Sequence, residues 1–199
     1  MFLEKIILID KDEKLVNAWK EAFGDEKNFE VLAGDYFSCP ADAMVSPANS
    51  FGIMDGGLDL AIRDIIGYDT EERLKNKILL EYHGELPVGS AIIVNTSHEK
   101  WPYLISAPTM RVPMDVSNTL NAYLAFRAIL LAIKKFNENK SAMKIKSVVC
   151  SGLGTGIGCM EPRKCAAQMR VAYSYLTKPA RIPSFQEIHE VHRRLNVVI

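Results

Sequence analysis

The chain has 199 residues, and its 24 Lys and Arg residues balance its 24 Asp and Glu residues. This length predicts one domain, large enough to bury a full hydrophobic core without disulfides or metals. The balanced charge excludes a strong overall field that would attract nucleic acid or anionic lipid, and no stripe of interleaved aromatic and basic residues suits single-stranded nucleic acid.

Cysteine usage and hydropathy favour a cytoplasmic protein. The four cysteines stand singly, no CxxC pair is present and no secretory leader precedes them, so we expect reduced thiols and a cytoplasmic location. The most apolar long stretch, 120–136, contains Arg127, Lys134 and Lys135. It is too short and too charged to span a bilayer, and we expect a buried helix without membrane association.

Apolar runs alternate with helical periodicities along nearly the whole chain. In chain order the pattern predicts strand 5–9, helix 12–23, strands 29–33 and 41–46, helices 58–66 and 70–82, strands 90–95 and 103–107, helix 117–136, strand 145–150, and helices 162–176 and 184–195. Thr70 is expected to open its helix, with acidic residues in the first turn.

Strands separated by helices indicate an α/β sheet covered on both faces. We expect one domain over 1–178, with 179–199 forming a helical extension packed on it. In such sheets ligands bind at the carboxyl ends of the strands, on the loops that lead into helices. The functional search therefore begins at those loops.

Two of these loops have unusual compositions. "SGLGTGIG", residues 151–158, places glycine at alternate positions directly after a strand, and "SPANSFGIMDGGLDL", residues 46–60, places a glycine pair before a helix. Backbone without side chains can turn successive N–H groups toward one anion, and a helix N-terminus adds a favourable dipole. Neither loop matches GxxxxGK[ST] or GxGxxG. Together they could form two walls of a cleft suited to a diphosphate, although each could be a turn without a ligand.

The order and spacing of three motifs resemble the macrodomain family. They are "AGDYF" at 33–37, "DAMVSPANSFGIMDGGLDLAI" at 42–62 and "GLGTGIG" at 152–158, and the resemblance covers residues 29–177. It implies a three-layer α/β/α fold with a mixed central sheet. It also implies binding of ADP-ribose or ADP-ribosylated molecules, and some members hydrolyse ADP-ribosyl esters or ADP-ribose 1″-phosphate.

The resemblance assigns roles residue by residue. Asp35 matches the residue that reads adenine, and Asn49 matches the asparagine that binds the distal ribose. The other ligand-binding positions are Asp55, Gly56, Gly57 and Leu58 in the first loop and Gly154, Thr155, Gly156, Ile157 and Gly158 in the second. The residue types alone allow alternatives. Asp35 could cap a helix or turn, Asn49 could form an Asx-turn that holds its loop, and Ile157 could pack into the core.

Asp59, together with Asn49, is the catalytic candidate. It falls where hydrolytic members place the aspartate that orients or activates a water at the distal ribose, although an acidic residue in the first turn of a helix also favours the dipole. Ser46 replaces the first asparagine of the family's N-A-A-N stretch, and Asp55 replaces a glycine.

These departures affect the expected reaction type and not the expected ligand class, and the sequence as a whole leaves three functions open. The leading one is hydrolysis of an ADP-ribose derivative, with neither metal nor cofactor. The alternatives are a non-catalytic ADP-ribose reader and a structural domain whose glycine loops bind nothing.

Overall fold

The computed structural model describes residues 3–139 and 143–196. Its elements are β1 (Lys5–Asp10), α1 (Glu13–Phe23), β2 (Phe29–Ala33), the 3-10 helix η1 (Tyr36–Ser38), β3 (Ala43–Ser46), α2 (Gly57–Ile66), α3 (Tyr68–Tyr82), β4 (Ile92–His98), β5 (Trp101–Ser106), α4 (Asn121–Glu138), β6 (Ser147–Cys150), α5 (Pro162–Thr177) and α6 (Phe185–Asn196).

The described strands form one six-stranded mixed sheet in the order β2-β1-β6-β3-β5-β4. All neighbouring pairs are parallel except β4 and β5, which are antiparallel. The predicted α/β fold with a mixed central sheet is therefore confirmed. Because five strands share one direction, the loops that follow β1, β2, β3, β5 and β6 meet at the same edge of the sheet.

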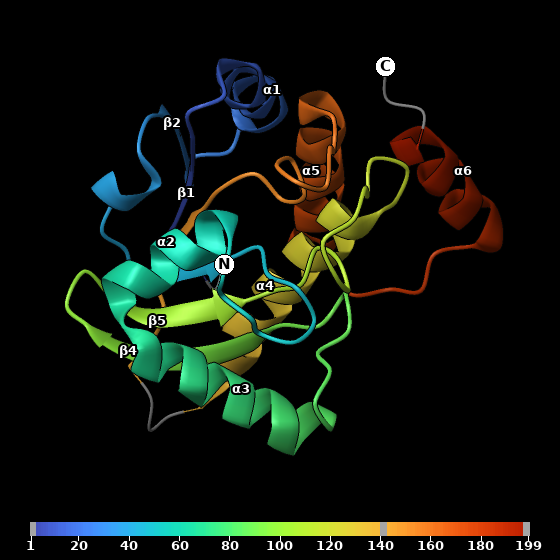
Figure 1. Cartoon of the computed structure of the whole chain (residues 1–199). Helices are drawn as coiled ribbons and strands as arrows, with labels where there is room; N and C mark the ends of the chain where they lie inside the picture. The colour runs from blue at the N-terminus through green and yellow to red at the C-terminus, as the bar shows by residue number, and fades with distance from the viewer. Residues whose placement is uncertain (1–2, 140–142, 197–199) are drawn as a thin grey trace.

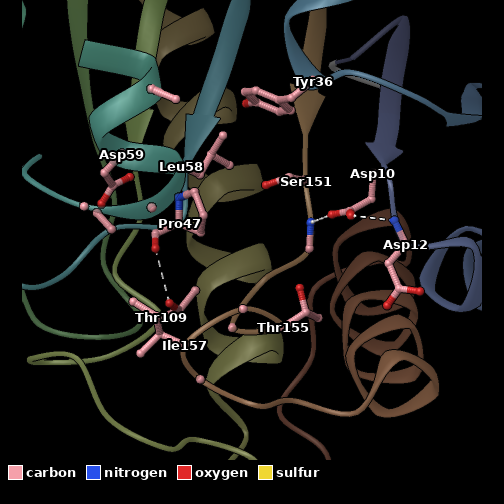
Figure 2. A pocket seen from close by; sticks show the side chains of 18 of the residues that line it. Asp10, Asp12, Tyr36, Pro47, Leu58, Asp59, Thr109, Ser151, Thr155 and Ile157 are labelled. Carbon is pink, nitrogen blue, oxygen red and sulfur yellow. Dashed lines mark hydrogen bonds between the residues drawn. The ribbon is translucent and has the colours of Figure 1, made fainter. Parts of the chain in front are cut away.

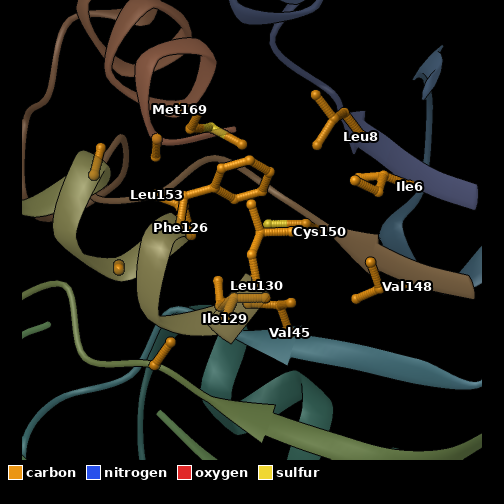
Figure 3. Close-up of a cluster of buried hydrophobic side chains, with 14 of the residues drawn as sticks. Ile6, Leu8, Val45, Phe126, Ile129, Leu130, Val148, Cys150, Leu153 and Met169 are labelled. Carbon is orange, nitrogen blue, oxygen red and sulfur yellow. The ribbon is translucent and has the colours of Figure 1, made fainter. Parts of the chain in front are cut away.

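Helices cover both faces of this sheet (Figure 1). Alternate residues of each strand point to opposite faces. In β1, Ile6 and Leu8 join a core with α1, α4 and α5, whereas Ile7 and Ile9 join a second core with α2 and α3. Figure 3 shows the first core between the sheet and its helices, with Phe126 close to Cys150. Two-sided burial explains why these strands read as continuous apolar runs.

Two helices begin two or more residues away from the predicted start, whereas the other starts agree within one residue. The long helix α4 begins at Asn121, because the segment before it turns to bind the second glycine loop, where the Val116 N–H donates to the Gly158 carbonyl at 2.8 Å. Helix α3 begins at Tyr68, directly after Gly67 at a φ of 90°. Thr70 is therefore not its cap, and its buried hydroxyl donates to the Ile66 carbonyl at 3.1 Å.

The C-terminal helix α6 lies beside α5, away from α2 and α3 (Figure 1). Its buried anchor is Leu195, while Phe185 and Ile188 are exposed. His189 and His192 are also exposed.

Candidate functional site

A cleft of about 590 Å³ opens at the carboxyl edge of the sheet. Loops after β1, β2, β3, β5 and β6 contribute to its walls. Every residue that the sequence nominated lines this cleft: Asp35, Asn49, Asp55, Gly56, Gly57, Leu58, Asp59, Gly154, Thr155, Gly156, Ile157 and Gly158. Two glycine loops separated by nearly a hundred residues therefore face a common hollow.

At the floor of the cleft, strands β3 and β6 separate around the hydroxyl of Tyr36. Pairing between β3 and β6 runs only as far as Met44 and Val149. Beyond it the Tyr36 hydroxyl accepts from the Val45 N–H at 2.9 Å and lies 2.7 Å from the Val45 carbonyl and 3.2 Å from the Val149 carbonyl. A side chain thus satisfies backbone groups that a strand neighbour would otherwise bind.

The first loop is organised by Asn49. Its Oδ1 accepts from the N–H groups of Phe51 at 3.0 Å and Ile53 at 3.3 Å, and its Nδ2 donates to the Ile53 carbonyl at 2.7 Å. The Asx-turn alternative is therefore realised in this structure. One N–H of the Asn49 amide has no partner among the described residues.

Helix α2 begins in the open cleft. Gly56 precedes it without a side-chain cap, and Gly57 adopts a φ of 56°, in the left-handed region that favours glycine. A Cβ at either glycine would meet no atom of the described residues within 4 Å. The first-turn N–H groups of a helix have no partner within the helix, so they and the dipole present a positive end to this space.

Asp59 lies in that first turn, half-buried at the cleft wall. The hydroxyl of Ser46, at the end of β3, donates to its Oδ1 at 2.6 Å. Burial raises the pKa of Asp59 to about 6, with further upward contributions from the charges of Asp55 and Glu71, while the Ser46 hydrogen bond opposes the shift. The group is therefore a carboxylate at neutral pH, and a more basic one than an exposed aspartate.

The second loop is held by hydrogen bonds to the Asp10 side chain and within its own backbone. The Gly152 N–H donates to Asp10 Oδ2 at 3.2 Å, and the Met160 N–H donates to the Gly154 carbonyl at 2.9 Å. A Cβ at Gly158 would stand 2.5 Å from that same carbonyl oxygen, so the loop requires glycine there. Among the described residues the N–H groups of 154–158 have no hydrogen-bond partner, which leaves them available to an anion.

Ile157 is 63% exposed and lines the cleft, so it is not a plug into the core. Asp35 is exposed at the start of η1, where its Oδ1 accepts from the Phe37 N–H at 3.2 Å. The capping alternative for Asp35 is thus also realised, and its second carboxylate oxygen faces no partner among the described residues.

Sequence reasoning missed the loop after β1. Asp10, Lys11 and Asp12 line the cleft, and Figure 2 places Asp10 and Asp12 on the side opposite Asp59 and Leu58. Asp10 joins two loops, since it also accepts from the Asp12 N–H at 3.0 Å. The carboxyl-end rule, applied to every strand rather than to glycine-rich loops alone, would have found them.

Comparisons with known proteins agree with this architecture. A family model of the Macro domain matches residues 45–169, which is more than half of the chain. The chain belongs to the macrodomain family. The match includes both glycine loops, and the resemblance seen in the sequence is confirmed.

Relatives and solved structures extend the comparison. A protein of Aquifex aeolicus, described only as uncharacterized, is 33% identical over 144 residues, covering 72% of this chain and 79% of the relative. A macrodomain of Oceanobacillus iheyensis with a Gly-to-Val substitution, solved with ADP-ribose, matches with a TM-score of 0.63 at 14% identity, covering 98% and 94% of the two chains. The macrodomain of Mycobacterium tuberculosis DarG matches with a TM-score of 0.59 at 20% identity, covering 72% and 88%. These structural likenesses show a shared fold.

The described part of the macrodomain contains no helix long and apolar enough to cross a membrane. Within the same residues no three His, Cys, Asp or Glu side chains gather as a metal site would require.

Proposed function

We propose that this macrodomain binds ADP-ribose derivatives in the cleft and hydrolyses the bond at C1″ of the distal ribose. The observation that carries the proposal is Asp59: a half-buried carboxylate with a raised pKa, fixed by Ser46. It stands in a cleft where the N–H groups of 154–158 have no partner among the described residues. The Oceanobacillus iheyensis macrodomain solved with ADP-ribose shares this fold, which supports the ligand class.

Backbone groups, rather than cationic side chains, would hold the diphosphate. The unpaired N–H groups of 154–158 and the start of α2 stand on two loops that line the same cleft. Asp35, on the loop after β2, would accept from the exocyclic amine of adenine through its unpaired oxygen. The diphosphate would then bend the distal ribose toward Asp59, and positioning would supply much of the rate.

In the proposed step, a water held by Asp59 attacks C1″. Its oxygen bonds to C1″, the bond from C1″ to the acceptor oxygen breaks with its electrons leaving on the acceptor, and Asp59 takes one proton from the water. A general base with a pKa near the operating pH contributes about 10²–10⁴ in rate. ADP-ribose 1″-phosphate and ester-linked ADP-ribosyl protein both fit this scheme.

The test combines binding with turnover. ADP-ribose should bind by calorimetry, and Asp59→Asn should lower kcat at least about 100-fold while ADP-ribose still binds. Asp69→Asn is the matched control, because Asp69 is exposed in the first turn of α3 and lies outside the cleft lining. Equal loss of activity in both variants, or none in Asp59→Asn, would contradict the catalytic role.

A non-catalytic ADP-ribose reader is the second candidate. It is favoured by Asn49, whose amide is largely occupied by its own loop and is thus less available to orient a reacting ribose. Tight binding of ADP-ribose without turnover of either substrate would select this function.

A further inference from the structure

The cleft carries an unusual excess of negative charge for a site that would receive a diphosphate. Its described lining includes the carboxylates of Asp10, Asp12, Asp35, Asp55 and Asp59, and one basic side chain, Lys11. Anion binding here therefore depends on local backbone N–H groups. Any part of a ligand that lies beyond those groups meets a field that disfavours further negative charge.

The charges are unevenly placed along the cleft. Lys11 belongs to the β1 loop, whose Asp10 and Asp12 lie opposite Asp59 in Figure 2. Asp55 lies just before α2 and lines the same cleft, and its charge adds to the rise in the Asp59 pKa that burial chiefly causes. The part of the cleft around Asp59 thus has two carboxylates and no neighbouring cation among the described lining residues.

Two arginines outside the cleft lining are already paired. Arg63, one turn after Asp59 in α2, lies 3.7 Å from a carboxylate oxygen of Glu71. Arg111 lies on the loop after β5, outside the cleft lining, and its guanidinium donates to both carboxylate oxygens of Glu85, at 2.7 and 2.9 Å. Two exposed apolar side chains also line the cleft: Ile53, two residues before Asp55, is 41% exposed, and Ile157 is 63% exposed. A rim that combines acidic and apolar side chains accepts an uncharged group better than an anion.

We propose that Asp55 is a specificity residue that disfavours ADP-ribose derivatives carrying an anionic group on C1″ and so directs this cleft to ADP-ribose esters of protein side chains. The inference rests on the proposed function for the place of the distal ribose. A 1″-phosphate would add up to two negative charges beside Asp55 and Asp59, whereas an ester leaves the carbonyl neutral until its bond breaks. A nucleic-acid acceptor is disfavoured for the same reason, since it would bring phosphates to the acidic rim.

The experiment compares three substrates: ADP-ribose 1″-phosphate, a glutamate-linked ADP-ribosyl peptide with no other charged residue, and an ADP-ribosylated oligonucleotide. For the parent protein we expect kcat/KM for the peptide to exceed that for the 1″-phosphate by about 10-fold or more, a difference that salt reduces. Asp55→Asn should move this ratio toward the 1″-phosphate by about 10-fold. Asp69→Asn, an exposed acid outside the cleft lining, should leave the ratio unchanged.

Binding measurements test the inference even if the protein turns over no substrate. In that case the proposed hydrolysis fails, and the dissociation constants of ADP-ribose and ADP-ribose 1″-phosphate are compared instead. ADP-ribose should bind at least about 10-fold more tightly than the 1″-phosphate, and Asp55→Asn should reduce this difference in affinity. Equal or tighter binding of the 1″-phosphate, an unchanged ratio in Asp55→Asn, or preferred turnover of the oligonucleotide would each overturn the assignment of Asp55.

Discussion

The hydroxyl of Ser46 donates to Oδ1 of Asp59 at 2.6 Å, joining the last residue of β3 to the first turn of α2. Ser46 is fully buried, so this carboxylate has a fixed protein donor on one oxygen while the cleft remains open to it. Hydrogen bonding to the charged form lowers a pKa, and burial raises it. The raised pKa of Asp59 is the balance of the two.

Removing the donor should therefore raise the pKa of Asp59 further. A hydrogen bond to a charged group contributes about 1.5–3 kcal/mol, so Ser46→Ala should shift the titration upward by about one unit or more. Carboxyl-detected NMR titration measures it directly.

Ser106 supplies the matched control. It stands beside Ser46 in the register of β3 and β5, is equally buried, and its Oγ has no partner among the described residues. Ser106→Ala should leave the Asp59 titration unchanged, and an equal shift in both variants would refute a specific role for Ser46.

Asp59 should also cost the protein stability at neutral pH. Its pKa is about 6 in the folded protein against 3.8 for an unperturbed group, so between these values the folded state binds more protons than the unfolded state. The free energy of unfolding that this group contributes is thus present at low pH and is lost as pH rises through 6, by up to about 3 kcal/mol.

Asp59→Asn should abolish the decrease in the free energy of unfolding that Asp59 causes as pH rises. We expect the variant to gain stability relative to the parent as pH rises from 4 to 7.5, measured by urea denaturation at each pH. Comparing the two proteins at the same pH cancels the opposite contribution of carboxylates whose pKa is lowered, such as Glu85. A constant difference across this range would show that Asp59 is not desolvated in solution.

The layered fold could be predicted from the sequence because strands buried on both faces appear in it as apolar runs. The runs 6–9 and 148–150 are continuously apolar, and helices between the strands carry one apolar face. The glycine loops were found for a similar reason: their composition is unusual for any purpose other than close backbone approach. At Gly158 the structure shows a need for glycine, since a side chain there would collide with Gly154 and Val116. Anion binding by this loop stays a prediction.

Relationships between distant residues could not be predicted from one sequence. Nothing in the run Lys5–Asp10 indicates that this strand lies between β2 and β6. The hydrogen bond from the Gly152 N–H to Asp10 could therefore not be predicted. The Ser46–Asp59 hydrogen bond was hidden in the same way, because it needs the helix that follows the loop to fold back over the strand. Local patterns specify elements, whereas sheet order decides which loops meet.

Tyr36 should contribute to stability through its hydroxyl. Tyr36→Phe would leave the buried Val45 N–H without its 2.9 Å acceptor, at a cost of about 1–3 kcal/mol. Urea denaturation should show the loss, and the Val45 amide should exchange its hydrogen faster. Tyr68→Phe, at an exposed tyrosine, is the control and should unfold as the parent does. Unchanged exchange at Val45 in Tyr36→Phe would mean that the strands close without the hydroxyl.

Substitution by alanine should destabilise the protein at Gly158 but not at Gly156, two glycines of the second loop. Gly158→Ala places a methyl group 2.5 Å from the Gly154 carbonyl oxygen and 2.6 Å from Val116 Cγ2, so the loop must move, at a cost of about 1–3 kcal/mol. Gly156→Ala meets nothing within 4 Å and should change stability by less than about 0.5 kcal/mol. Thermal unfolding separates the two variants.

Calorimetry with ADP-ribose then tests whether the second loop binds the ligand. Gly156→Ala should bind ADP-ribose more weakly although its fold is intact. The reason is that the added methyl group enters a cleft wall whose N–H groups are proposed to hold the diphosphate. Parent-like affinity in this stable variant would remove the second loop from the binding site.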